Sequence, residues 1–207
     1  MKTIKQLAGV GLLSVAMLQS AWAQEPESCK MVRFAEIGWA DIAATTGVAM
    51  TLSEGLGYQT RKIMASVPIA FTGVQKSQID VFLGYWAPSM DAVIEPFTKD
   101  GGVKVLPKAN LEGAKYTLAV PTYAAEAGLK SFADIAKFKD QLDGKIFGIE
   151  PGNDGNLLID GMIKSNQFGL GEFKMIESSE AGMLVQLQRA VKKKEPAVFL
   201  GWAPHPM

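Results

Sequence analysis

Two stretches decide the predicted fold: Val81-Phe82-Leu83-Gly84-Tyr85-Trp86-Ala87-Pro88 and, later in the chain, Val198-Phe199-Leu200-Gly201-Trp202-Ala203-Pro204. In both, an apolar run ends at a glycine and leads, directly or after one tyrosine, into a Trp-Ala-Pro triplet. A short apolar run bounded by turn residues is typical of a strand buried on both faces in a parallel sheet. The repeated pattern therefore predicts two similar lobes, each of which places a tryptophan at one shared cleft.

The sequence around these stretches alternates between predicted strands and helices, which is typical of α/β folds. In the first half we predict strands at 32–37, 58–64 and 79–84, with helices at 45–56 and 68–77. In the second half we predict strands at 145–150, 173–177 and 197–201, with helices at 155–165 and 179–193. A strand at 115–121 and a helix at 131–141 are predicted between them. The predicted fold is thus α/β, with one βαβαβ lobe over residues 24–113 and a second over residues 114–207.

The first 23 residues have the three parts of a secretory signal peptide. Lys2 and Lys5 give a positive start, residues 7–18 are apolar, and Ala21-Trp22-Ala23 is a small-residue cleavage site. The apolar run is too short to cross a bilayer. We therefore predict a mature chain that begins at Gln24 and, in a chain of bacterial type, a periplasmic location.

Composition limits the classes of partner. The chain has 207 residues, no net charge and 20% charged residues, which fits a globular protein and gives no support for nucleic acid or a membrane surface as a partner. Cys29 is the single cysteine, which is unusual in an exported protein. Together with the end of the chain at Met207, directly after a predicted strand and its motif, this predicts a fragment of a longer protein.

All three tryptophans after the signal peptide, Trp39, Trp86 and Trp202, lie at predicted strand tips, where open α/β sheets bind ligands. One buried tryptophan is usually part of a core, but three at strand tips are harder to explain by packing. Indole faces attract cations, and aromatic cages bind quaternary ammonium groups. One cation–π contact contributes up to about 2 kcal/mol, whereas micromolar binding needs about 8 kcal/mol. A counter-charge is therefore required, and Asp41 is the candidate, although it could also cap the following helix.

Four stretches together resemble the periplasmic solute-binding proteins of glycine betaine, choline and proline betaine ABC importers, and most closely their choline-binding branch. They are Phe34-Ala35-Glu36-Ile37-Gly38-Trp39-Ala40-Asp41, Asp80-Val81-Phe82-Leu83-Gly84-Tyr85-Trp86-Ala87-Pro88, Gly148-Ile149-Glu150-Pro151-Gly152-Asn153-Asp154-Gly155 and Phe199-Leu200-Gly201-Trp202-Ala203-Pro204-His205-Pro206. The resemblance covers essentially the whole mature chain. It implies a type II periplasmic-binding-protein fold that closes over a quaternary ammonium compound and delivers it to a permease in the inner membrane. The implied protein is a monomer without cofactor or metal.

The resemblance also implies roles for individual residues. Asp41 would face the ammonium charge, and Asn153 would bond the hydroxyl group of choline. Asp154, more simply read as the cap of the next helix, and His205 are further candidates. Members of the family continue beyond the point where this chain ends, and the choline-binding branch joins its N-terminal cysteine to that part by a disulfide, which would explain the lone Cys29. The implied aromatic box consists of Trp39, Trp86, Tyr116 and Trp202.

Three alternatives to a choline-binding protein remain open. A glycine betaine or proline betaine binder would need donors for the ligand's carboxylate, but Arg33 and Arg61 lie away from the strand tips, and Asp41 would repel that group. An enzyme is not supported, because His205 is the only histidine and the sequence has no G-x-S-x-G or H-E-x-x-H motif. We therefore expect no catalytic residues. The third alternative is a truncated fragment without function.

Overall fold

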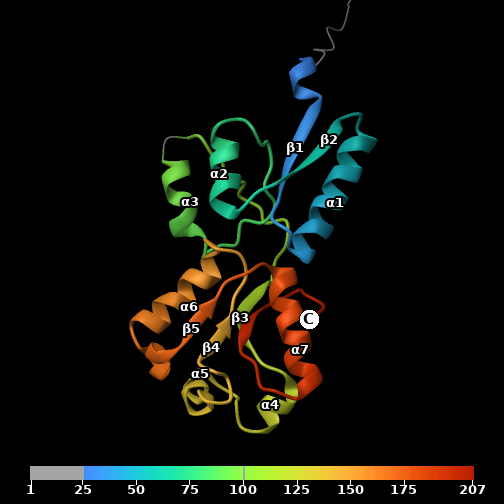
Figure 1. Cartoon of the computed structure of the whole chain (residues 1–207). Helices are drawn as coiled ribbons and strands as arrows, with labels where there is room; N and C mark the ends of the chain where they lie inside the picture. Colours follow the sequence, from blue (N-terminus) through green and yellow to red (C-terminus); the bar gives the residue numbers. More distant parts are fainter. Residues whose placement is uncertain (1–25, 100) are drawn as a thin grey trace, which may run out of the picture.

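The computed structural model describes residues 26–99 and 101–207. The predicted signal peptide and its cleavage site lie outside these residues. Two α/β bodies follow one another along the molecule (Figure 1). We call the part from residue 26 to the end of helix α3 (Asp91–Thr98) the N-terminal lobe, and the part from strand β3 (Lys115–Ala119) onward the C-terminal lobe. The predicted lobe boundary near Gly113 falls in the connection between these two elements.

The N-terminal lobe is built on a two-stranded parallel sheet. Strand β1 (Met31–Glu36) pairs in register with β2 (Gln59–Met64). The predicted third strand at 79–84 is wrong in extent, because only one bridge, between Phe34 and Val81, joins it to β1. After this bridge the chain leaves the sheet, and the carbonyl of Leu83 accepts a hydrogen bond from the Asn110 side chain at 3.1 Å instead of from a strand.

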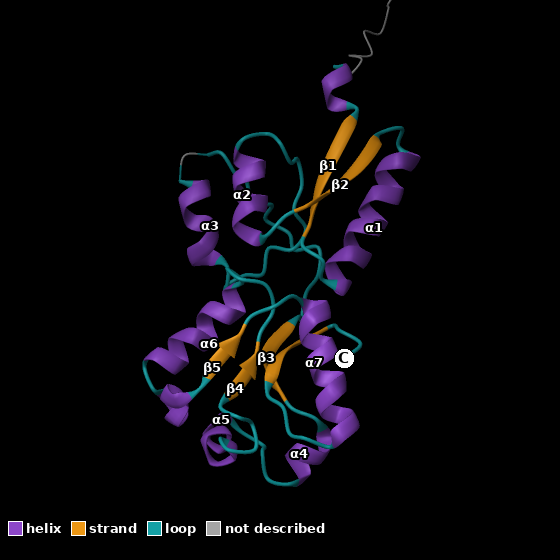
Figure 2. Ribbon diagram, in the orientation of Figure 1, coloured by secondary structure: helices purple, strands orange, loops and turns teal. Residues whose placement is uncertain are grey.

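The lobe has three helices (Figure 2): α1 (Ala40–Gly55) lies against the sheet, and α2 (Val67–Gln75) lies between the sheet and α3. Helix α1 begins five residues before the predicted start at 45, so that Trp39 lies immediately before its first turn. Helix α3 was not predicted from the sequence, and Pro96 lies inside it. Phe71 of α2 is buried and packs edge-on against Phe82 at a ring distance of 5.5 Å, which ties α2 to the segment that carries the first Trp-Ala-Pro triplet.

The C-terminal lobe has a four-stranded sheet in the order β3-β6-β4-β5. Strands β4 (Lys145–Phe147), β5 (Lys174–Ile176) and β6 (Phe199–Ala203) are parallel, and β3 runs antiparallel to β6. This register places Tyr116 directly opposite Trp202. Two predicted site residues from distant parts of the chain are therefore cross-strand neighbours.

Helices surround this second sheet: α4 (Thr122–Glu126), α5 (Phe132–Ile135), α6 (Asp154–Lys164) and α7 (Glu180–Lys193), with 3-10 turns at Ala136–Phe138 and Gln167–Glu172. A further 3-10 turn, Glu27–Cys29, precedes β1 in the N-terminal lobe. The predicted helix at 131–141 is only α5 and the 3-10 turn that follows it. The predicted cap of α7 is confirmed, since the Ser179 hydroxyl accepts the Gly182 N–H at 3.1 Å. Within the described residues, no helix is long and apolar enough to cross a membrane.

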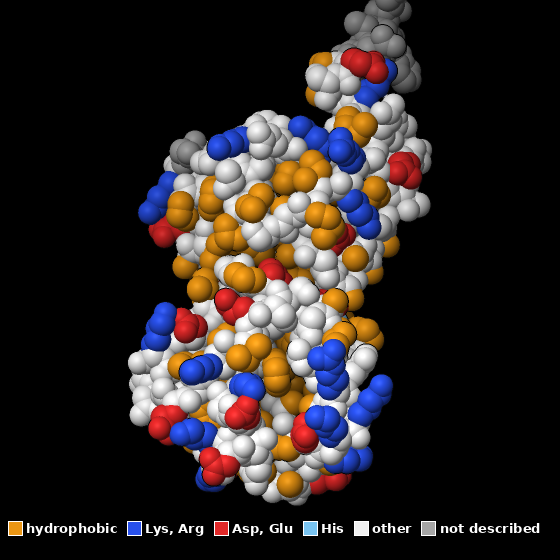
Figure 3. Space-filling model, viewed as in Figure 1, with side chains coloured by type: hydrophobic (Ala, Val, Ile, Leu, Met, Phe, Trp, Pro, Cys, Tyr) orange, Lys and Arg blue, Asp and Glu red, His pale blue; other side chains and the backbone are white. Residues whose placement is uncertain are grey.

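The N-terminal lobe has a large open cleft of about 760 Å³ between α1, α2, α3 and residues 103–114. Most of its lining is apolar, including Phe71, Phe82 and Ile94. Hydrophobic side chains are spread over the N-terminal lobe in the view of Figure 3, whereas charged side chains are more frequent on the C-terminal lobe.

Candidate functional site

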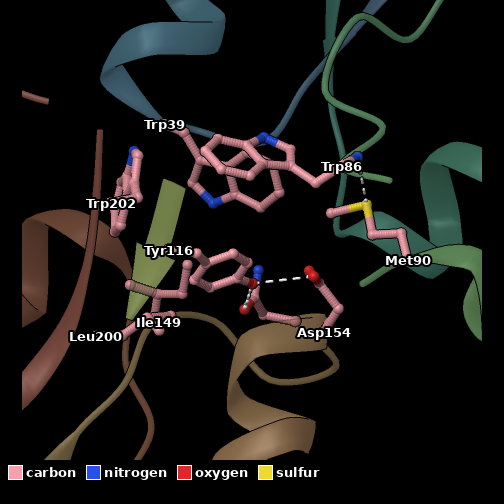
Figure 4. Close-up of a pocket in the computed structure, with 9 residues that line it drawn as sticks. Trp39, Trp86, Met90, Tyr116, Ile149, Asp154, Leu200 and Trp202 are labelled. Carbon is pink, nitrogen blue, oxygen red and sulfur yellow. Dashed lines mark hydrogen bonds between the residues drawn. The ribbon is translucent and has the colours of Figure 1, made fainter. Parts of the chain in front are cut away.

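A small cavity of about 20 Å³ lies where the two lobes meet. The four aromatic residues predicted from the sequence all line it, and Figure 4 shows the indoles of Trp39 and Trp86 on one side, the phenol ring of Tyr116 on another and Trp202 beside them. The lining residues are Trp39, Trp86 and Met90 from the N-terminal lobe and Tyr116, Ile149, Asn153, Asp154, Leu200 and Trp202 from the C-terminal lobe.

Trp39 is placed by a turn and fixed by a contact between the lobes. Gly38 has a positive φ of 95°, which an L side chain rarely adopts, and this turn brings Trp39 from the end of β1 to the start of α1. The Trp39 side chain is buried, and its indole N–H donates to both carboxylate oxygens of Glu150, at 3.1 and 3.0 Å. The Trp39 ring of the N-terminal lobe is thus held by the Glu150 carboxylate of the C-terminal lobe.

Trp86 and Tyr116 form the second part of the box across the lobes. Their rings meet edge to face at 5.4 Å and 75°, an arrangement that aromatic pairs favour. The backbone N–H of Trp86 lies 3.4 Å from the sulfur of Met90, which closes one end of the cavity. The Ala–Pro bonds of both Trp-Ala-Pro triplets are cis.

Tyr116 is fixed by its hydroxyl group and by close packing. The hydroxyl donates to Asp154 Oδ2 at 3.0 Å and lies 3.5 Å from Asn153 Oδ1 (Figure 4). Burial and the Asp154 charge raise the pKa of Tyr116, so the hydroxyl remains a donor. Helix α6 approaches the ring so closely that a Cβ atom at Gly155 would lie 2.4 Å from Tyr116 Cε2. The ring and the first turn of α6 therefore fit together only with glycine at this position.

The capping residue of α6 is Asn153, and the interpretation of Asp154 as the cap is wrong. Asn153 Oδ1 accepts the N–H groups of Gly155 at 2.8 Å and Asn156 at 3.3 Å, which satisfies two amides that the helix leaves unpaired. Asp154 lies in the first turn, is 2% exposed and has one carboxylate oxygen, Oδ1, without a hydrogen bond. Asp154 therefore contributes a buried charge to the cavity wall, and the Asn153 oxygen is already engaged by the helix.

Asp41 lies in the first turn of α1 and lines the larger N-terminal cleft rather than the small cavity. It does not cap the helix: Trp39 occupies the cap position, and no side chain bonds there. Both carboxylate oxygens are buried and make no hydrogen bond of good geometry. Burial raises the pKa of Asp41, and the charge of Glu180 adds to this, although the nearby backbone amides and the Trp202 indole N–H attract the carboxylate and partly offset it. Asp41 thus carries a poorly compensated charge next to the box.

His205 supports the box from outside and does not line it. Its ring packs edge-on against Trp202, with 4.6 Å between ring centroids, and Nε2 lies 3.0 Å from Glu180 Oε1. The histidine side chain is 2% exposed. His205 thus packs against Trp202 from outside the small cavity.

The box is surrounded by carboxylates without matching cations. In the described part of the chain, no lysine or arginine forms an ion pair with Asp41, Glu150, Asp154 or Glu180, and only His205 pairs with one of them. Burial raises the pKa of Glu150 as it does for Asp41. The described residues contain no group of three or more side chains suited to a metal ion. Aromatic faces beside uncompensated negative charge are suited to an organic cation.

Sequence reasoning missed Glu150 and Glu180 as members of this site. Both follow the pattern that located the tryptophans: Glu150 comes soon after β4, and Glu180 begins α7 after β5. The rule that ligands bind beyond the carboxyl ends of strands could have included them. Nothing in the local sequence, however, reveals that their partners are Trp39 and Ala40 in the other lobe.

Comparison with known protein families assigns the chain to one family. Residues 30–207 match the OpuAC family, described as the substrate-binding domain of ABC-type glycine betaine transport systems. The chain is similar to an uncharacterized protein of Chromohalobacter salexigens, ORF1, with 51% identity over 139 residues, which cover 67% of this chain and 87% of that protein.

Solved structures give the same result. An ABC-transporter choline-binding protein in complex with choline has 55% identity and a TM-score of 0.84, and its unliganded semi-closed form has 54% identity and a TM-score of 0.78. The matches cover 88% and 87% of this chain but only 63% and 62% of those chains. Lactococcal OpuAC in complex with glycine betaine has 26% identity and a TM-score of 0.75, with 85% of this chain and 66% of that chain covered. The chain thus has a type II periplasmic-binding-protein fold and spans less than two thirds of the choline-binding relative.

Proposed function

We propose that this chain, which belongs to the OpuAC family of substrate-binding domains of ABC-type glycine betaine transport systems, binds choline or a closely related quaternary ammonium cation. In this proposal it is the periplasmic solute-binding component of an ABC importer and delivers its ligand to a permease in the inner membrane. The family is one of transporter substrate-binding proteins, not of enzymes. The site residues are the four rings of the box, Asp41 and, at the cavity wall, Asn153 and Asp154.

One observation carries this proposal: four aromatic rings from both lobes converge beside carboxylates that have no cationic partner. A quaternary ammonium group has no N–H donor, so it is bound through aromatic faces and charge rather than through hydrogen bonds. A cation also relieves the cost of burying the carboxylates of Asp41 and Asp154 without a cationic partner. The same arrangement would not favour a neutral ligand.

The charges favour choline over a zwitterionic betaine. The carboxylate of glycine betaine needs donors, and among the described residues no lysine or arginine lines the small cavity. Arg33, one of the candidates, is held by Asp80 through bonds of 2.7 and 2.8 Å, and Arg61 is exposed on β2. Glycine betaine remains the second candidate, because lactococcal OpuAC binds it in the same fold.

Ligand entry requires the box to open. A cavity of about 20 Å³ has room for roughly one water molecule, which is far less than a trimethylammonium group needs. The rings of Trp86 and Tyr116 contact each other in this structure, and the rings of the box must separate to admit a ligand. Because the rings come from both lobes, rotation of one lobe away from the other separates them.

Titration of the purified chain with choline tests the proposal. Tryptophan fluorescence is expected to change on binding, and calorimetry with choline and then glycine betaine in competition gives the preference between them. Trp86→Ala is expected to abolish the response, whereas Trp86→Phe is expected to retain part of it, since a smaller aromatic face remains. A folded chain that binds neither ligand would contradict the proposal and favour a fragment without function.

A further inference from the structure

Two adjacent residues of the N-terminal lobe bond to two acidic side chains of the C-terminal lobe. The Trp39 indole N–H donates to Glu150, and the backbone N–H of Ala40 donates to Glu180 Oε2 at 3.0 Å. The partners are 111 and 140 residues apart in sequence. Trp39 lies just before helix α1, and Ala40 is its first residue. Both bonds therefore fix the start of α1, and the first of them also fixes the Trp39 ring.

Each glutamate is oriented from its own lobe, independently of Trp39 and Ala40. Glu150 receives the Asn153 side-chain N–H at 3.4 Å, and its backbone carbonyl accepts from the Asn156 side chain at 3.2 Å. Glu180 is 6% exposed, and its other oxygen lies 3.0 Å from His205 Nε2. The C-terminal lobe therefore presents two fixed acceptors to the N-terminal lobe, and hydrogen bonds to ionised acceptors are stronger than neutral ones.

We propose that Glu150 and Glu180 are positioning residues that hold Trp39 and the start of α1 against the C-terminal lobe, and so assemble the aromatic box when the lobes close. Glu150 acts on the indole ring, and Glu180 acts on the backbone. The two contacts are consequently separable, because a change of the Trp39 side chain removes only the first.

The effect of these residues on ligand affinity rests on the proposed function, but their effect on Trp39 does not. If only the closed arrangement binds tightly, the apparent affinity falls in proportion to the closed fraction. Loss of one charged acceptor is expected to weaken choline binding by about tenfold. Glutamine retains an acceptor oxygen for the indole N–H, so Glu150→Gln is expected to retain more affinity than Glu150→Ala.

Nuclear magnetic resonance of the Trp39 indole N–H in the protein without ligand tests the contact directly, with the resonance assigned by its loss in Trp39→Phe. Glu150→Ala is expected to shift this resonance upfield and to accelerate its hydrogen exchange, whereas Glu150→Gln preserves much of the protection. Glu172→Ala is the control, because Glu172 lies in the same lobe but is 76% exposed and forms its ion pair with Lys139, away from Trp39. An unchanged Trp39 resonance and exchange rate in Glu150→Ala would overturn the proposal.

A double-mutant cycle separates a positioning role from general destabilisation. Trp39→Phe keeps an aromatic ring but removes the indole N–H, so adding Glu150→Ala to it is expected to cause little further loss of choline affinity. Equal losses from Glu150→Ala with and without Trp39→Phe would refute the coupling. If the chain binds no choline at all, the proposed function fails, while the exchange measurement still decides whether Glu150 holds Trp39.

Discussion

Gly155→Ala tests the assembly of the box through a single added methyl group. A Cβ at this position would lie 2.4, 2.5 and 2.7 Å from Cε2, Oη and Cζ of Tyr116. Ordinary van der Waals contact begins at 3.4 Å, so the ring must withdraw by about 1 Å. Trp86 packs against the other side of Tyr116 at 5.4 Å, and β3 fixes the tyrosine backbone. The ring therefore has little room to move without leaving the cavity.

The expected cost follows from two contributions. Overpacking of this kind costs about 1–3 kcal/mol of folding free energy. Displacement of one ring from the box removes a cation–π contact of about 0.5–2 kcal/mol, which corresponds to a loss of choline affinity of about twofold to thirtyfold. Gly155 does not have a positive φ, so alanine meets no backbone strain there, and its helix preference alone would stabilise α6.

Gly161→Ala is the matched control in the same helix, because nothing lies within 4 Å of its added Cβ. This control is expected to stabilise the protein by about 0.5–1 kcal/mol and to leave choline affinity unchanged. Denaturant unfolding and calorimetric titration of both variants give the two quantities. If Gly155→Ala matches Gly161→Ala in both stability and affinity, Tyr116 does not form the packed wall that the structure indicates.

Two further changes probe the charges around the box. Burial raises the pKa of Asp41 and Glu150, so choline affinity is expected to fall as pH decreases through these raised pKa values. At a pH near these pKa values, choline binding is expected to release protons. Calorimetry in buffers of different ionisation enthalpy detects this release. Because the folded-state pKa of Asp41 is raised, stability falls as pH rises from the unfolded pKa to the folded pKa, and the loss is complete above it. Asp41→Asn is therefore expected to stabilise the ligand-free protein at neutral pH while weakening choline binding, and a destabilised variant would contradict this. Tyr116→Phe leaves Asp154 Oδ2 without its donor and is expected to cost about 1–3 kcal/mol in denaturant unfolding, and no cost would argue against that hydrogen bond.

The rings of the site could be located from sequence because their signals are local. The Trp39, Trp86 and Trp202 positions each follow an apolar run or strand that ends at glycine, and the rule for open α/β sheets then places them at one edge. Tyr116 came from the resemblance, and the structure gives its physical basis in the cross-strand pairing with Trp202.

Other features could not be predicted because they depend on distant partners or on the exact start of a helix. Asn153 and Asp154 are both suitable caps, and only the position of the first turn of α6 decides between them. Residues 79–84 have the composition of a buried strand, but a strand also needs a neighbour, and beyond the single bridge at Val81 the chain bonds elsewhere. The contacts of Glu150 and Glu180 with Trp39 and Ala40 depend on how the two lobes pack, which no local sequence pattern specifies.

Carboxylates at the lobe interface have two opposite effects on the free energy of closure: their mutual repulsion disfavours it, and the hydrogen bonds that they accept favour it. In this arrangement of the lobes, burial raises the pKa of Asp41 and the like charge of Glu180 adds to this, so the ionised carboxylates disfavour the arrangement without a cation. The bonds from Trp39 to Glu150 and from Ala40 to Glu180 act in the opposite direction. When these contributions nearly balance, a ligand needs only a modest differential affinity to close the lobes, and a cation supplies it by neutralising the repulsion. Selectivity for a positive ligand then follows from closure itself, because a ligand that brings its own carboxylate adds to the repulsion instead of removing it.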